Sequence, residues 1–244
     1  MYIFEVINRY FKPESGFLMS PGVLIALGLT SEHLVRTAGG ALMDERAAEA
    51  FLKLQSRAEK AGFKLSIASG FRSYQRQLTI FNDKWSGERP VLDDNNAVLV
   101  REDHTDEDWL HRILRFSALP GTSRHHWGTD VDIYDPSLMP DDYSLQLKAS
   151  EYRTGGIFEY LSQWLDGVIA DDDSEGFYRP YDCDRGGVSV EPWHLSFSPV
   201  ASKSRAALTP DSLRDFWSHH PDLRPKGYEV LVRELDNLMA RYVV

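Results

Sequence analysis

Most residues of this chain that are clustered in the sequence and could bind a metal ion lie in two short segments. Residues 123–132 read SRHHWGTDVD, and residues 191–194 read EPWH. A fold that uses both segments has to bring them to one point across the chain that separates them. Two imidazoles and a carboxylate are donors typical of a catalytic zinc site, which leaves a fourth position open. The spare glutamate, Glu191, could then move protons, so the pattern predicts a hydrolytic zinc centre.

Spacing within the first segment limits which side chains can act together. Asp130 and Asp132 stand two residues apart in a predicted strand, so they face the same side of a sheet. His125 and His126 precede that strand in a loop, and spacing alone does not choose between them as the ligand. Gly128 permits the tight backbone turn that would bring a loop histidine to a strand aspartate.

The second segment predicts an irregular backbone. On a straight strand Glu191 and His194 would face opposite sides, because three is an odd offset. Pro192 removes a ladder donor, which is typical of an edge or an irregular entry into a strand. We therefore expect a kink that lets both side chains approach one ion.

A non-haem iron(II) site is the main alternative from the residue types, since it also uses two histidines and a carboxylate. Its first ligands usually form a His-x-Asp pair, whereas His125 and Asp132 stand seven residues apart. His126 and Asp130 do not supply that pair either, and Glu191 fits hydrolysis better than oxygen chemistry. The remaining histidines are interpreted as structural or exposed: His33, His104, His111, His219 and His220.

Composition excludes several classes of function. The net charge of -10 argues against nucleic-acid binding and against adhesion to an anionic membrane. The single cysteine, Cys183, excludes an intramolecular disulfide framework and a multi-cysteine zinc site. No apolar run is long enough for a membrane span, and the first residues do not resemble a secretory signal. The sequence therefore predicts a cytoplasmic protein, with periplasmic or extracellular delivery by another route as the alternative.

Periodicity predicts helices interleaved with a few antiparallel strands, which is an α+β fold with a small sheet that carries the zinc site. Helices are expected over residues 41–62, from Ser73 to about residue 85, from Thr105 onward, and over 156–170, 210–218 and 225–241. Strands are expected over 64–69, 129–133 and 194–197, while residues 86–104 and 171–187 are interpreted as loops. No repeat or linker is found, so we expect a single domain. It comprises an N-terminal extension (1–40) packed on a zinc peptidase domain (41–200), and C-terminal helices (201–244).

The motifs resemble those of a known family. Ser123-x-His125-x-x-Gly128-x-x-x-Asp132, followed by the EPWH segment, closely resembles the VanY-type D-alanyl-D-alanine carboxypeptidases. These belong to a wider group of zinc peptidases that includes the D-Ala-D-Ala dipeptidases and the amino-terminal domain of Hedgehog proteins. Residues 69–77 (SGFRSYQRQ) also resemble that family's Ser-Gly-Tyr-Arg-Ser-x-x-x-Gln signature. The resemblance spans residues 45–200.

The resemblance implies a role for each residue of these motifs. The implied zinc ligands are His125, Asp132 and His194, and Glu191 is the implied general base. Arg72 would stabilise the oxyanion or the substrate carbonyl, as a fixed fork of donors can.

The remaining motif positions would meet the substrate. Ser123 and Gln77 are implied to contact its terminal carboxylate or backbone. Asp130 departs from the family, which often has a small residue there. Asp130 would either bind a substrate amine or form a hydrogen bond to one of the metal-ligating side chains. Residues 86–117 look like an insertion that could form one wall of the substrate groove.

By resemblance we expect a zinc-dependent D,D-carboxypeptidase that removes the C-terminal D-alanine from peptidoglycan stem peptides or muropeptides, with no obligate protein partner. An L,D-carboxypeptidase on tetrapeptides, a D,D-dipeptidase or a peptidoglycan endopeptidase would use the same site. From another class, a catalytically silent, zinc-stabilised peptidoglycan-binding module is the alternative. The presence of both Glu191 and Arg72 argues against the silent module.

Overall fold

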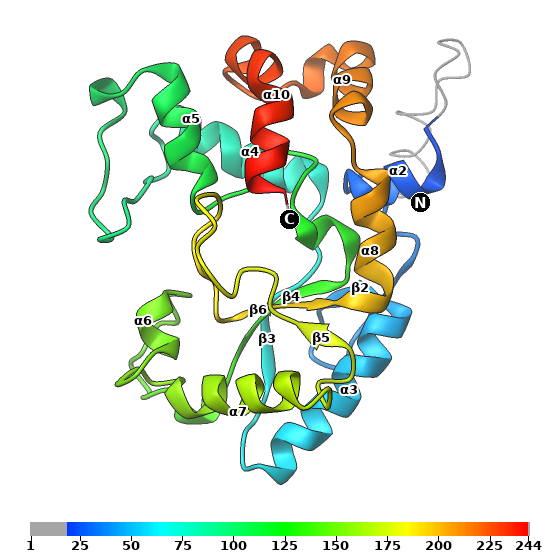
Figure 1. The fold of residues 1–244 in the computed structure, drawn as a ribbon, viewed down its shortest axis with the longest axis vertical. Coiled ribbons are helices and arrows are strands. Elements are labelled where there is room, and N and C mark those ends of the chain that lie inside the picture. The colour runs from blue at the N-terminus through cyan, green and yellow to red at the C-terminus, as the bar shows by residue number, and fades with distance from the viewer. Residues whose placement is uncertain (1–18, 244) are drawn as a thin grey trace. The chain divides into compact units, whose positions relative to one another are not determined.

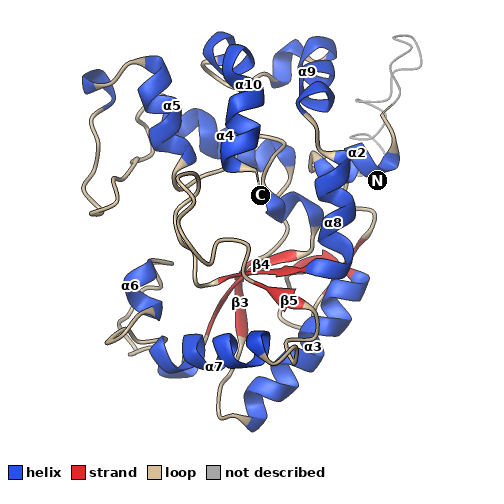
Figure 2. Cartoon of the chain, in the orientation of Figure 1, coloured by secondary structure: helices blue, strands red, loops and turns tan. Residues whose placement is uncertain are grey.

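Four short antiparallel strands form the main sheet of the protein (Figure 2). The computed structural model describes residues 19–243. The strand order is β3 (Ser66–Ser69), β4 (Asp130–Tyr134), β6 (His194–Phe197) and β5 (Phe177–Tyr178). Because β4 and β6 are the two inner strands, both segments singled out in the sequence reach the centre of one sheet.

One face of this sheet is apolar and is covered by α3 (Glu45–Lys60) and α7 (Glu159–Ala170) (Figure 1). Val131 and Ile133 of β4 and Leu195 of β6 are fully buried and join one core cluster with Phe51 of α3 and Leu161 of α7. Side chains alternate across a strand. The residues between these apolar positions therefore occupy the opposite face, which is where the polar side chains of the two motifs lie.

The sheet belongs to a unit made of residues 33–71 and 127–202. The remaining elements of this unit are the hairpin β1 (Leu34–Arg36) and β2 (Leu42–Asp44), the 3-10 turn η4 (Pro136–Leu138), and the short helix α6 (Ala149–Tyr152). Asp44 caps α3, since its side chain accepts hydrogen bonds from the first free N–H groups of that helix.

A second unit is helical and comprises, among the described residues, 19–32, 72–126 and 203–243. Its helices are α2 (Pro21–Ala26), α4 (Tyr74–Trp85), α5 (Asp106–Leu114), α9 (Pro210–His219) and α10 (Tyr228–Tyr242), with 3-10 turns η2 (Arg101–Asp103) and η5 (Pro221–Leu223). Tyr74 joins three of these elements, because its hydroxyl accepts a hydrogen bond from Trp217 (2.7 Å) and donates one to the carbonyl of Leu223 (2.8 Å). The turn η3 (Arg124–Trp127) and helix α8 (Ser198–Ala207) each contain residues of both units.

The predicted α+β class with a small antiparallel sheet is confirmed. Most predicted helices and strands are present within a few residues, and Ser73 and Thr105 cap α4 and α5 as expected. Helices α2, α6 and α8 and strands β1 and β2 were not predicted. The predicted helix over 41–62 is wrong at its start, because β2 (Leu42–Asp44) lies there, and the interpretation of 171–187 as loop throughout is wrong because β5 lies there. The division into 1–40, 41–200 and 201–244 stays a prediction, and residues 1–18 lie outside the described part. No helix within residues 19–243 is long and apolar enough to cross a membrane.

Candidate active site

The pairing of β4 with β6 places two predicted ligands side by side. Asp132 is the register partner of His194, and Asp130 is the register partner of Ser196. All four side chains lie on the polar face of the sheet and are buried. Directly opposed residues of an antiparallel pair have Cβ atoms about 5 Å apart. The strand register by itself therefore brings a carboxylate and an imidazole within reach of one small ion.

His194 is surrounded by carboxylates. Its Nε2 lies 2.9 Å from Oδ1 of Asp130, while its Nδ1 lies 3.1 Å from Oε2 of Glu191 and 3.5 Å from Oδ1 of Asp132. Burial alone would lower the pKa of His194, but the hydrogen bonds to Asp130 and Glu191 and the charge of Asp132 outweigh it and raise the pKa to about 10. These surroundings favour a positive charge beside Nδ1, whether it is a proton or a metal cation.

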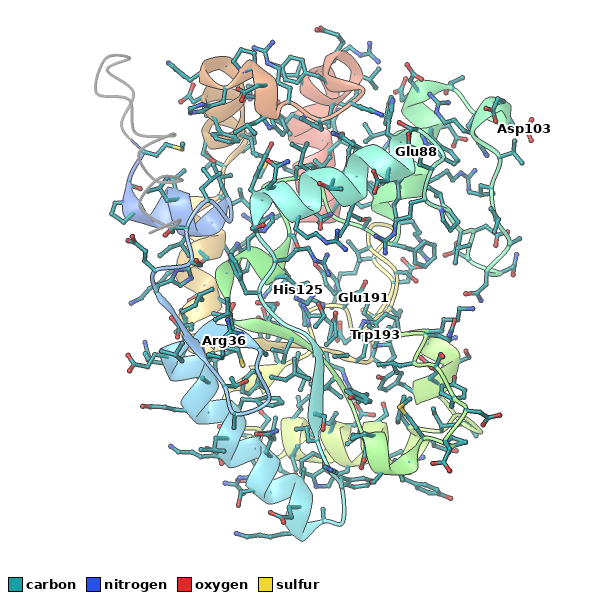
Figure 3. The ribbon with its side chains drawn as sticks, turned by 180° about the vertical axis from the view of Figure 1, so that it is seen from behind. Arg36, Glu88, Asp103, His125, Glu191 and Trp193 are labelled. Atoms are coloured by element: carbon teal, nitrogen blue, oxygen red, sulfur yellow. The ribbon has the colours of Figure 1, made fainter. Side chains whose placement is uncertain are left out.

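The EPWH segment is a tight turn, which supplies the kink that the odd spacing predicted. The N–H of His194 donates to the carbonyl of Glu191 (3.1 Å), so both side chains come to the same side of the chain. Glu191 and Trp193 lie next to each other in the loop that leads into β6 (Figure 3). The turn is held at its middle by Arg179, whose Nε donates to the carbonyl of Pro192 (2.8 Å).

His125 completes a three-residue group of potential metal ligands. His125, Asp132 and His194 each offer one ligand atom, these atoms lie within 4.8 Å of one another, and all three residues are buried. Two imidazoles and one carboxylate match the donor set of catalytic zinc sites. The two carboxylates directed at Nδ1 of His194 leave negative charge for a cation to neutralise. The residues therefore fit the zinc ion that the sequence predicted.

The neighbouring His126 has both ring nitrogens occupied. Its Nδ1 donates to the carbonyl of Arg72 (2.6 Å), and its Nε2 accepts from the N–H of Gly121 (3.2 Å). Complete burial, together with the charges of Arg72 and His125, lowers the pKa of His126 to about 3, although the bond to the Arg72 carbonyl acts in the opposite direction. These contacts favour His125 as the ligand, since the ring of His126 is already hydrogen-bonded at both nitrogens, and the assignment of His125 stays a prediction.

Arg72 is oriented by Gln77. One guanidinium nitrogen of Arg72 donates to Oε1 of Gln77 (2.9 Å), and Nε2 of Gln77 donates to the carbonyl of Ala118 (2.7 Å). The backbone N–H of Arg72 also donates to the carbonyl of His125 (3.0 Å), so the backbone of the arginine is fixed to the backbone of a predicted zinc ligand. Gln77 is fully buried and its amide is used on both sides. The observed contacts of Gln77 hold the guanidinium of Arg72 in place. Its predicted contact with the substrate stays a prediction.

Ser123 is buried just before η3, and its carbonyl accepts from the N–H of His126 (3.0 Å). Its predicted contact with substrate also stays a prediction.

Sequence reasoning did not single out three residues that support this site. Arg179 holds the EPWH turn, and the hydroxyls of Thr129 and Ser196 both donate to Oδ2 of Asp130. Arg179 stood inside a segment interpreted as loop, where no periodicity marks it. Ser196 could have been found, because it stands two residues after His194 on the same strand face.

Comparison with known proteins identifies the family of this chain. A family model described as "VanY: D-alanyl-D-alanine carboxypeptidase" matches residues 40–200. An uncharacterised protein of Haemophilus influenzae is 36% identical over 129 residues, which cover 52% of this chain and 94% of the relative.

Two solved structures are similar at lower identity. VanYB in complex with D-alanine-D-alanine is 23% identical, with a TM-score of 0.48 and coverage of 71% of this chain and 81% of that chain. A mutant of the vancomycin-resistance D,D-pentapeptidase VanY in complex with Zn(II) is 22% identical, with a TM-score of 0.47 and coverage of 77% and 92%. The match of the family model over most of the chain shows that this protein belongs to the VanY family of D-alanyl-D-alanine carboxypeptidases.

Proposed function

We propose that this protein is a zinc-dependent D,D-carboxypeptidase that removes the C-terminal D-alanine from peptidoglycan stem peptides. The observation that carries the proposal is the convergence of Asp132 and Glu191 on Nδ1 of His194, with His125 in the same ligand group. Membership of the VanY family supplies the substrate class. His125, Asp132 and His194 would hold the zinc ion, which when bound supplies Lewis acidity to the scissile carbonyl and acidifies water.

Glu191 is the proton carrier of the proposed reaction. Its carboxylate is partly exposed, with 18% of the side chain accessible, whereas the ligands Asp132 and His194 are almost fully buried. It can therefore meet both water and substrate. Its carboxylate takes a proton from the attacking water and then delivers that proton to the leaving nitrogen of D-alanine.

Arg72 is the proposed partner of the developing negative charge. A guanidinium stays protonated throughout the reaction, and its donors are already oriented by Gln77. A donor held in place before the reaction stabilises an oxyanion without a reorganisation cost.

The test is mass spectrometry of zinc-loaded protein incubated with stem pentapeptide, stem tetrapeptide and free D-Ala-D-Ala. Wild type is expected to remove one alanine from the pentapeptide only, and Glu191→Gln is expected to bind zinc normally but to lose turnover. Glu49→Gln, an exposed carboxylate on α3, is the control and should keep full activity. Glu191→Gln with a tenth or more of wild-type activity would refute the role of Glu191.

The same experiment separates the alternatives. Cleavage of the tetrapeptide would indicate an L,D-carboxypeptidase, and cleavage of the free dipeptide would indicate a D,D-dipeptidase. Three intact substrates with one zinc bound would favour an endopeptidase or a silent binding module. Because peptidoglycan precursors and recycled muropeptides occur inside the cell, we propose cytoplasmic action, with action on the wall as the alternative.

A further inference from the structure

Asp130 is a fully buried carboxylate on the ligand-bearing face of β4. A buried carboxylate is costly unless charged or polar partners compensate it. Asp130 has such partners on both oxygens. Oδ1 lies 2.9 Å from Nε2 of His194, and Oδ2 accepts hydrogen bonds from the hydroxyls of Thr129 (2.6 Å) and Ser196 (3.1 Å).

These contacts fix the orientation of the His194 ring. A carboxylate without a proton only accepts hydrogen bonds, so Nε2 of His194 must carry the hydrogen that lies between the two groups. The other ring nitrogen, Nδ1, is then the one directed at Asp132 and Glu191. In metal sites, a ligating histidine commonly donates its second N–H to a carboxylate, which fixes its tautomer and raises its basicity.

We propose that Asp130 is a positioning residue that makes Nδ1 of His194 the metal-ligating atom and strengthens its bond to the ion. This inference rests on the proposed zinc site and goes beyond the metal ligands themselves. A role for Asp130 in binding a substrate amine is less compatible with these contacts, because a fully buried carboxylate with three partners has no free oxygen directed at solvent.

The first test measures zinc affinity by competition with a chromogenic chelator. Asp130→Asn keeps the shape of the side chain and removes its charge, and it is expected to weaken zinc binding by about 10- to 100-fold. The visible spectrum of the cobalt(II)-substituted variant should change as well, because the ligand field at His194 changes. Thermal unfolding of the metal-free proteins shows whether the variant folds.

Asp135→Asn is the matched control. Asp135 is also fully buried, but it accepts hydrogen bonds from the backbone N–H groups of Lys64 and Ser137 (both 2.8 Å). Its replacement should lower the melting temperature without changing zinc affinity or the cobalt spectrum. If Asp130→Asn folds and binds zinc within twofold of wild type with an unchanged spectrum, the inference is wrong.

A second measurement uses the wild-type protein and does not depend on a variant that folds. Nitrogen-15 NMR of the zinc-loaded protein should show His194 with a protonated Nε2 and a metal-bound Nδ1. Metal at Nε2 would overturn the inference.

The results that contradict this inference differ from those that contradict the proposed function. Zinc binding without hydrolysis contradicts the function alone, while hydrolysis with unaltered zinc affinity in Asp130→Asn contradicts this inference alone.

Discussion

His126→Asn is expected to make the folded protein less sensitive to mild acid while leaving zinc binding intact. In the folded state His126 is neutral, with a pKa of about 3 against an ordinary value of 6.5, because it is completely buried. A histidine with a lowered pKa stabilises the fold above its ordinary pKa, and this contribution is lost as the pH falls towards the folded-state value. The sensitive window is therefore pH 6.5 down to 3.

The magnitude follows from these two pKa values. Between pH 7 and pH 5 the unfolded chain protonates His126 almost completely, whereas the folded chain does not. The contribution of His126 to the free energy of unfolding therefore falls by about 1.9 kcal/mol over this range. Asparagine can still donate to the carbonyl of Arg72 but does not reach Gly121. It leaves a buried N–H without its partner and should cost about 1–3 kcal/mol at every pH.

Urea unfolding of the metal-free wild type and variant, followed by tryptophan fluorescence, measures both effects. Wild type should be more stable at pH 7, and its advantage over His126→Asn should shrink by about 1.9 kcal/mol at pH 5. Other titrating groups affect both proteins and cancel in the difference. A difference that stays constant between pH 7 and pH 5 would refute the assigned burial and neutrality of His126.

Zinc binding separates the two adjacent histidines. His126→Asn should bind zinc with an affinity close to that of wild type, whereas His125→Asn should lose most of it, because only His125 belongs to the ligand group. The opposite result would show that His126 is the ligand.

Two further predictions concern Arg72 and Gly128. Arg72→Ala should lower kcat by about a hundredfold or more while zinc stays bound, in line with the loss of an oxyanion donor, and an unchanged kcat in steady-state assays would remove Arg72 from the mechanism. Gly128→Ala should destabilise the fold by about 1–3 kcal/mol, because Gly128 has a φ of 73° and an added Cβ would lie 2.3 Å from Cδ2 of Leu34. Its melting temperature should fall by several degrees, and an unchanged value would contradict the strain argument.

The sequence was informative where a local rule decides the outcome. The odd offset between Glu191 and His194 required a kink, and the structure shows a tight turn there. Period-two spacing put Asp130 and Asp132 on one face, and the strand register agrees. The caps at Ser73 and Thr105 also follow from local chemistry.

Features decided by distant contacts could not be predicted in this way. His125 and His126 differ because both ring nitrogens of His126 are hydrogen-bonded, one to the carbonyl of Arg72 and one to the N–H of Gly121. The spacing of residues in the sequence does not reveal either contact. Arg179 acts through the carbonyl of Pro192, so its role depends on a fold that brings the two together. Strand β5 has only two residues, which is too short for any periodicity to show.

Strand pairing holds Asp132 next to His194. The loops between these two residues can therefore change in length, whereas the strand that carries Asp132 cannot. Insertions or deletions in the exposed stretches 140–142 and 182–186 would leave the pairing of β4 with β6 unaltered. One extra residue between Asp130 and Asp132 would move Asp132 to the face occupied by Val131. Changes in length are therefore compatible with this site in the exposed loops, whereas a single residue inserted within the strand would remove Asp132 from it.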